Sequence, residues 1–226
     1  MLSGVDLKKK AVGEKAVEYI QDEMVIGLGS GSTVYWMMKK LGELVSEGFR
    51  VKGVPSSVRT EGWAKEFGIP LAYFSEVSRL DLAIDGADEV DPEYNLIKGG
   101  GGSLLREKLV DAAADRLIIV VDDSKLVRTL GAFPLPVEVV PFGWELTAQR
   151  LAMLDCTPKL RMKEEKIFIT NNGNYILDCQ FDSITNPSKL HQQLKLTLGV
   201  VETGLFTNMT DIVIVSNDEG VQIKEK

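Results

Sequence analysis

Four acidic residues gather within a segment of seven, Asp85-Gly86-Ala87-Asp88-Glu89-Val90-Asp91, directly after an apolar run. Carboxylates at this density suit ligation of Mg²⁺ or Ca²⁺, although the segment lacks the glycine that an EF-hand loop has at its sixth position. They suit equally hydrogen bonding to sugar hydroxyls, or acid–base catalysis by paired carboxylates. A solvated acidic turn is the ordinary alternative. Asp85 is the hardest to explain in that way, because it ends the apolar run.

A second segment, Gly27-Leu28-Gly29-Ser30-Gly31-Ser32-Thr33, places glycines and hydroxyls before a predicted helix. It lacks the glycine spacing and the later acid of a dinucleotide fingerprint, and it lacks the lysine that precedes the hydroxyl in a Walker A loop. Backbone N–H groups and the helix dipole at such a turn favour a phosphate. A tight strand-to-helix turn without a ligand explains the glycines equally well.

A third segment, Lys98-Gly99-Gly100-Gly101-Gly102, holds four consecutive glycines. Ordering such a run has a large entropic cost, which a fold accepts mainly where the backbone must approach a ligand or move. We favour close approach to a ligand over a flexible lid, because the run lies between a predicted strand and a predicted helix.

Two single side chains are ambiguous from the pattern alone. In the predicted helix 103–114, Glu107 lies opposite an apolar face, which the helical wheel assigns to Leu105, Leu109, Ala112 and Ala113. The wheel therefore predicts a surface glutamate near a helix start, where acids are favoured by the dipole. Lys125 follows an apolar run, and it is either a phosphate clamp or a surface lysine.

The composition limits the possible functions. The 226 residues carry a net charge of −7, with one histidine and two cysteines. This acidity disfavours nucleic acid and anionic membranes as partners, so a phosphate-bearing ligand needs a local positive site. A single histidine, His191, which we interpret as structural, disfavours His-rich metal sites and a Ser-His-Asp hydrolase. Cys156 and Cys179 are too few for a disulfide framework and form no C-x-x-C motif. We therefore expect a reducing compartment, the cytoplasm.

We expect neither a signal peptide nor a membrane span. The chain starts MLSGVDLKKKAVG, which contains no apolar leader segment. The longest apolar runs, such as 117–121, are far shorter than the ~20 residues that cross a bilayer.

The element pattern predicts an α/β fold with a Rossmann-like, mostly parallel sheet and helices on both faces. Predicted helices alternate with short apolar strands along the first 121 residues. The helices are 6–21, 34–47, 57–67 and 103–114, and the strands are 24–28, 50–54, 80–84 and 117–121. Ligands of such sheets bind outside the carboxyl ends of the strands, so the loops that follow these strands are expected to converge on one crevice.

The pattern changes after residue 130, where Pro134-Leu135-Pro136 is expected to break the chain. We predict strands at 137–140, 166–170 and 175–179, with helices at 144–153 and 187–198, which indicates an inserted, smaller α+β domain. A strand at 211–215 is expected to return to the first sheet. The predicted domains are residues 1–131 with 208–226 for catalysis, and residues 132–207 for the insert.

Taken together, these segments resemble ribose-5-phosphate isomerase, type A, over essentially the whole chain. Several long motifs occur in the family's order: Gly29-Ser30-Gly31-Ser32-Thr33, Asp85-Gly86-Ala87-Asp88-Glu89, Lys98-Gly99-Gly100-Gly101 through Arg106-Glu107-Lys108, Ser124-Lys125, Pro134-Leu135-Pro136-Val137-Glu138-Val139 and Gly173-Asn174-Tyr175-Ile176-Leu177-Asp178. One departure is Ser30, where many members of the family have threonine. Serine keeps the hydroxyl.

The resemblance implies an aldose–ketose isomerase of the non-oxidative pentose phosphate pathway. Its substrates would be ribose 5-phosphate and ribulose 5-phosphate, with no metal and no cofactor. It implies Glu107 as the base, and Asp85, Asp88 and Lys98 as the groups that handle the sugar oxygens. Further substrate contacts would come from Ser30, Gly31, Ser32, Thr33, Gly86, Ala87, Gly99, Gly100, Gly101, Lys125 and Lys9. The family is usually a homodimer or homotetramer, and the insert is the expected site of oligomerisation.

These implied roles make chemical sense. Isomerisation removes the C2 proton of the aldose and returns a proton to C1, which one carboxylate can do over a cis-enediol. The developing enediolate needs fixed donors, which Lys98 and nearby glycine N–H groups supply. A phosphate held at a helix N-terminus orients the substrate.

Two other functions are weighed against the isomerase. An aminosugar-phosphate deaminase-isomerase of related fold is expected to carry a histidine in its site, whereas the only histidine here lies in the insert. A non-catalytic sugar-phosphate sensor normally carries a DNA-binding segment. This acidic chain has no spare segment of that kind.

Overall fold

The computed structural model describes residues 3–226, and the chain divides into two compact units. The first contains the chain up to Ala87, Arg106–Lys125 and Met209–Lys226. The second contains Asp88–Leu105 and Leu126–Asn208. Residues 88–105 and 126–131 therefore group with the second unit, outside the 132–207 segment that we predicted as the insert. The units are described separately below.

The first unit is built on a six-stranded sheet of order β15-β14-β6-β3-β1-β2. Its five parallel strands are β2 (Lys52–Pro55), β1 (Val25–Leu28), β3 (Leu82–Asp85), β6 (Leu117–Asp122) and β14 (Ile212–Asn217), and β15 (Gly220–Glu225) is antiparallel at the edge. The predicted α/β fold with a mostly parallel sheet is confirmed, and so is the return of the chain near residue 211.

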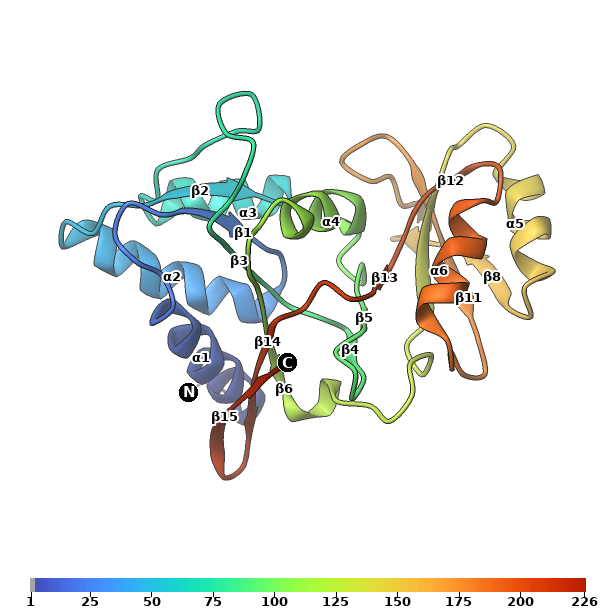
Figure 1. The fold of residues 1–226 in the computed structure, drawn as a ribbon. Coiled ribbons are helices and arrows are strands. Elements are labelled where there is room, and N and C mark those ends of the chain that lie inside the picture. Colours follow the sequence, from blue (N-terminus) through green and yellow to red (C-terminus); the bar gives the residue numbers. More distant parts are fainter. Residues whose placement is uncertain (1–2) are drawn as a thin grey trace. The chain divides into compact units, whose positions relative to one another are not determined.

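Helices cover both faces of this sheet. The first face packs against α1 (Gly4–Val17) and α2 (Ser32–Ser46), and Ile26 and Leu28 of β1 point into that core. The other face meets α4 (Leu104–Ala112), because a Cβ on Gly27 would lie 2.6 Å from a methyl of Val110. Alternate residues of one strand thus serve opposite faces. The third helix, α3 (Val58–Glu66), follows β2 (Figure 1).

The second unit holds a four-stranded sheet, a three-stranded sheet and a two-stranded hairpin. Four strands, β12 (Val200–Thr203), β7 (Leu135–Val139), β11 (Tyr175–Gln180) and β8 (Thr157–Leu160), form an antiparallel sheet. Three shorter strands, β13 (Leu205–Phe206), β5 (Leu96–Ile97) and β4 (Glu89–Val90), form the second sheet, also antiparallel. The helices are α5 (Trp144–Ala152) and α6 (Pro187–Lys195) (Figure 1). The predicted α+β character is confirmed.

Three local expectations for the second unit are wrong. The strand predicted at 166–170 is only β10 (Lys166–Ile167), which forms a hairpin with β9 (Met162–Lys163). Pro136 does not break the chain, because it lies inside β7, where its carbonyl accepts from the Gly204 N–H at 2.7 Å. The helix predicted to reach residue 198 ends at Lys195.

The core of the second unit contains the thiol of Cys179, which is fully buried. The Cys179 thiol lowers the pKa of its neighbour Cys156, and the Cys156 thiol raises the pKa of Cys179, which burial raises further. Cys179 therefore packs as a small apolar residue, as the sequence predicted.

No helix within residues 3–226 is both long enough and apolar enough to cross a bilayer.

Candidate active site

The glycine loop Gly29–Thr33 joins the carboxyl end of β1 to α2. Gly31 is the N-cap of α2, with φ at 107°, and no side chain caps the helix there. The first N–H groups of α2 therefore point out of the helix without a side-chain acceptor, which is the arrangement that binds an anion. Ser32 and Thr33 are the first residues of the helix and add two hydroxyls.

Asp85 holds this loop against the end of β3. Its side chain is fully buried, and its Oδ1 accepts from the backbone N–H groups of Ser30 at 2.9 Å and Gly86 at 2.7 Å. Gly29 lies directly on the carboxyl group, since a Cβ there would be 2.3 Å from Asp85 Cγ. The glycine at position 29 is thus required by a close approach, and Asp85 fixes the backbone of the loop.

Three hydroxyls that the sequence analysis did not select support the same loop from β2 and α3. Ser56, Ser57 and Thr60 are buried, and each has its oxygen within 3.2 Å of Ser30 Oγ. Ser57 is also the N-cap of α3 and accepts from the Thr60 N–H at 3.0 Å. The only signal in the sequence is a serine pair before a helix, which helix capping alone explains.

Glu107 lies on the buried face of α4, and only 4% of it is exposed. The helical-wheel assignment is wrong: the buried positions are Leu104, Glu107, Val110 and Asp111, whereas Leu109 is 57% exposed. Two acids on the inner face make the wheel misleading, because it places acids in solvent by default. Burying a carboxyl is costly, and active sites are where such burial is concentrated.

The loop after β6 contains Lys125 at the end of the short 3₁₀ helix η1 (Asp123–Lys125). Asp122 shapes the loop, because its carboxylate accepts from both the N–H and the hydroxyl of Ser124. Lys8 of α1 bridges this loop to the β14–β15 turn through Asp123 and Asp218, each at 2.9 Å. Hydrogen bonds to Asp218 and then Asp123 raise the pKa of Lys8. Lys8 thereby ties the first helix to the loop that carries Lys125.

The remaining predicted residues belong to the second unit, apart from Ala87, which follows Gly86 in the first unit, and Lys9, which is partly buried in α1. Lys98 is 2% exposed, and its ammonium lies 5.3 Å from the centroid of the Phe206 ring. Asp88 accepts from the Gly100 N–H at 2.8 Å. An aspartate thus fixes the second glycine loop as well.

Arg161 supports this second loop and was missed by the sequence analysis. Its Nη1 donates to the carbonyls of Gly99 at 2.8 Å and Gly100 at 3.2 Å. Its other edge pairs with the carboxylate of Asp178, with Nε 2.9 Å from Oδ2. Arg161 lies 61 positions beyond Gly100, so no local pattern announces the contact.

The structure therefore gathers the predicted residues into two sets. In the first unit, Ser30–Thr33 lie against Asp85 and Gly86, while Glu107 and Lys125 come from separate elements, α4 and η1. In the second unit, Asp88, Lys98 and the glycine run lie together. Among residues 3–226, no three His, Cys, Asp or Glu side chains are arranged to hold a metal ion.

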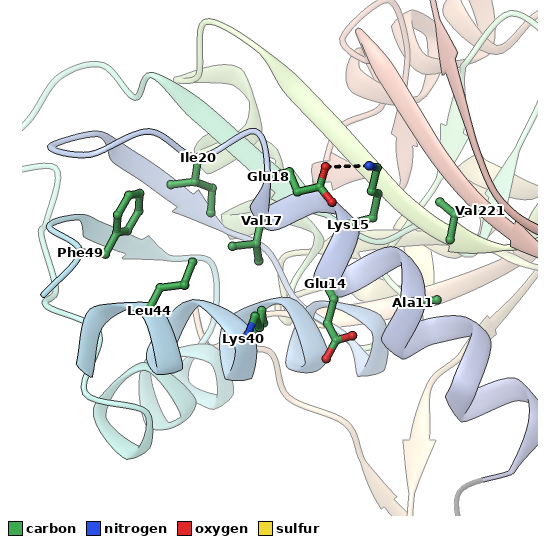
Figure 2. Close-up of a pocket in the computed structure, with 10 residues that line it drawn as sticks. All are labelled: Ala11, Glu14, Lys15, Val17, Glu18, Ile20, Lys40, Leu44, Phe49 and Val221. Carbon is green, nitrogen blue, oxygen red and sulfur yellow. Dashed lines mark hydrogen bonds and ion pairs between the residues drawn. The ribbon is translucent and has the colours of Figure 1, made fainter. Parts of the chain in front are cut away.

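A pocket of about 580 Å³ opens elsewhere on the first unit (Figure 2). Its apolar side is formed by Val17, Ile20, Leu44 and Phe49, and its charged residues are Glu14, Lys15, Glu18 and Lys40. Figure 2 shows the Lys15–Glu18 ion pair beside it. None of the predicted site residues lines this pocket, so it is separate from the candidate active site.

Comparison with known proteins gives a consistent result. The family model for ribose 5-phosphate isomerase A (phosphoriboisomerase A) matches residues 52–220. Ribose-5-phosphate isomerase A 1 of Oceanobacillus iheyensis is 53% identical over 97% of this chain and 98% of that protein. Ribose-5-phosphate isomerase A of Bacillus mycoides is 50% identical over 95% of this chain and 97% of that protein.

Solved structures agree. A D-ribose-5-phosphate isomerase in complex with phospho-erythronic acid matches 99% of this chain and 100% of its own, with a TM-score of 0.96 and 41% identity. Ribose 5-phosphate isomerase from Plasmodium falciparum matches 98% of this chain and 99% of its own, with a TM-score of 0.95 and 41% identity.

Proposed function

The chain belongs to the ribose 5-phosphate isomerase A family of aldose–ketose isomerases, and we propose that it interconverts ribose 5-phosphate and ribulose 5-phosphate through an enediol(ate) with Glu107 as the base. The carboxylate of Glu107 takes the C2 proton of the open-chain aldose and returns a proton to C1. The proton of the C2 hydroxyl passes to O1, so that the carbonyl moves from C1 to C2. The reverse sequence converts the ketose to the aldose. One base suffices because both carbons of a cis-enediol present the same face to it.

The observation that carries this assignment is the burial of Glu107. Most glutamates near the start of a helix lie in solvent, where they interact with the helix dipole at no desolvation cost. Glu107 is instead 4% exposed, on the inner face of α4. A carboxylate shielded from bulk water exchanges its proton with a substrate rather than with solvent.

The other predicted residues complete the reaction. Lys98 and the N–H groups of Gly99–Gly101 are proposed to stabilise the developing negative charge on the sugar oxygens. Asp85 and Asp88, beside Gly86 and Ala87, are proposed to bind the sugar hydroxyls and assist ring opening. The phosphate is assigned to the Ser30–Thr33 loop, with Lys125 and Lys9 as its positive partners. Uncapped N–H groups at the start of α2 support this last assignment.

Turnover of ribose 5-phosphate by the wild type and Glu107→Gln, both in EDTA, tests the base. We expect a loss in kcat of about 10³-fold, within the usual range for removal of an acid–base group, with substrate binding retained. Asp111→Asn is the matched control, because it neutralises a second buried acid on the same helix face. Equal losses of kcat in Glu107→Gln and Asp111→Asn would contradict the assignment of Glu107 as the base. Binding without turnover by the wild type would indicate a sensor instead.

The same assay tests the absence of a metal requirement. The acidic segment at Asp85–Asp91 is interpreted as sugar-binding, so exhaustive EDTA treatment is expected to leave kcat unchanged. Lost activity that Mg²⁺ restores would contradict this interpretation.

Lys125→Ala tests the phosphate assignment. We expect KM to rise far more than kcat falls, because Lys125 contacts the part of the substrate that does not react. Lys52→Ala removes an exposed lysine of β2 and serves as the control. An unchanged KM in Lys125→Ala would exclude Lys125 from the site.

We also propose that the chain acts as a homodimer or homotetramer through surfaces that include the second unit, and that its compartment is the cytoplasm. Large apolar side chains are exposed on this unit: Phe142 is 94% exposed, Leu196 is 87% exposed and Leu198 is 74% exposed. Exposed apolar surface of this kind marks protein–protein contacts. A monomer by light scattering at micromolar concentration would count against the oligomer.

A further inference from the structure

Four hydroxyl groups meet behind the first glycine loop, and together they define the role of Ser30. Ser30 Oγ lies 2.9 Å from Ser56 Oγ, 3.0 Å from Ser57 Oγ and 3.2 Å from Thr60 Oγ1. Ser56 and Thr60 are fully buried, and Ser57 is 5% exposed. A hydroxyl has one proton to donate, so in a buried cluster the partners decide where each proton points.

The direction can be followed from the far end of the cluster. Thr60 Oγ1 is 2.8 Å from the carbonyl of Gly29, and because a carbonyl only accepts, the Thr60 proton points there. Thr60 must then accept from Ser57, whose oxygen is 2.9 Å away. Ser57 in turn accepts from Ser30, since in that pair only Ser30 has the geometry of a donor. Ser56 is left to donate to Ser30.

The hydrogen bonds therefore run in one direction, from Ser56 to Ser30, Ser57, Thr60 and the Gly29 carbonyl. The Ser30 hydroxyl proton is donated within this series of hydrogen bonds, to Ser57. The backbone N–H of Ser30 is used too, because it donates to Asp85 Oδ1 at 2.9 Å. A phosphate offers oxygens that accept hydrogen bonds, so it needs donors from the protein. Ser30 has no donor left to offer it.

We propose that Ser30 is a positioning residue, held by the buried hydroxyls of Ser56, Ser57 and Thr60, and that the donors to the substrate phosphate begin at Gly31. This inference rests on the proposed phosphate site and changes one expected contact within it, that of Ser30. Thr60 is the key member because it holds the loop at two points, the Gly29 carbonyl and, through Ser57, the Ser30 hydroxyl. Its hydroxyl thus acts on the substrate only through the loop.

Removing the Thr60 hydroxyl is expected to loosen the loop without changing the residues proposed to act on C1 and C2 of the substrate. Thr60→Val keeps the shape of the side chain and removes its hydroxyl. We expect KM for ribose 5-phosphate to rise about 2- to 10-fold, the equivalent of one lost neutral hydrogen bond, while kcat stays within about 2-fold. Thr60→Ser restores the hydroxyl and is expected to restore KM. Thr147→Val, which removes a buried helix hydroxyl in the second unit, is the matched control.

A double-mutant cycle separates positioning from direct binding. If Ser30 acts only through the hydrogen-bonded hydroxyls, Ser30→Ala and Thr60→Val disrupt the same network. The KM of the double variant is then no higher than that of the poorer single variant. If Ser30 donates to the phosphate, the losses add, which would overturn the proposal. An unchanged KM in folded Thr60→Val would overturn it as well. If Thr60→Val does not fold, Ser56→Ala is the second probe, because it removes the first donor in the series of hydroxyl hydrogen bonds.

The same proteins distinguish this inference from the proposed function. If the wild type does not isomerise ribose 5-phosphate, the proposed function fails. The cycle is then measured on the Kd of ribose 5-phosphate, by calorimetry. Additive losses in that Kd contradict the role of Ser30, and non-additive losses support it, whatever the reaction.

Discussion

Each unit carries one glycine loop that contains predicted site residues, and the two loops are held by different physical means. In each loop an aspartate accepts from backbone N–H groups: Asp85 from Ser30 and Gly86, and Asp88 from Gly100. Behind the first loop lie neutral hydroxyls, three of them buried. The second loop is supported by a charged side chain, Arg161, whose guanidinium donates hydrogen bonds to loop carbonyls.

The two kinds of support differ in strength and in the partners that they need. Neutral hydroxyls make short, directional bonds that salt does not screen, and each contributes modestly. A guanidinium makes stronger, charge-assisted bonds to several acceptors at once, but it needs a counter-charge. Asp178 provides that counter-charge for Arg161. Apart from the aspartate that each loop has, the second loop therefore depends on one side chain, Arg161, whereas the first depends on several hydroxyls.

Among the variants that test these two loops, Arg161→Met is expected to have the largest effect. It removes both carbonyl contacts and leaves Asp178 without its partner, so we expect kcat/KM to fall about 10- to 100-fold, the equivalent of a lost charge-assisted hydrogen bond. Arg161→Lys is expected to restore only part of the loss, because an ammonium cannot reach both partners as a planar fork does.

Steady-state kinetics with ribose 5-phosphate measures this effect. Arg150→Met is the control, since that arginine makes a single long contact, at 3.4 Å, to the Leu198 carbonyl in the same unit. A kcat/KM for Arg161→Met within about 2-fold of the wild type would show that the second loop holds its shape without the charge.

Gly29→Ala tests the close packing of the first loop. The added methyl would lie 2.3 Å from Asp85 Cγ, so the loop or the carboxylate must move. We expect the free energy of unfolding to fall by about 1–3 kcal/mol, as for other overpacked sites, and urea denaturation measures it. Gly62→Ala, in α3, has open space around its Cβ and is the control. Equal stability for Gly29→Ala and the wild type would mean that Asp85 adjusts freely.

The sequence predicted the parallel sheet well, because alternating apolar strands and helices are local patterns that packing reinforces. It also placed the glycine loops and Asp85 at strand ends. It failed for Arg161 and Thr60, which support loops far away in the chain and carry no local signal. The helical wheel failed for Glu107, because periodicity assumes that charged side chains face water. Resemblance to a family, and not periodicity, selected that residue.

Among the variants of the two loops, Gly101→Ala is expected to change the structure least. A Cβ at Gly101 meets nothing within 4 Å, and its φ lies outside the left-handed region, so the unfolding free energy should change by less than about 0.5 kcal/mol. If the run exists so that the backbone can approach the substrate, the methyl occupies substrate space and KM for ribose 5-phosphate rises several-fold. An unchanged KM at unchanged stability would favour loop movement over close approach to the substrate as the reason for a glycine at position 101.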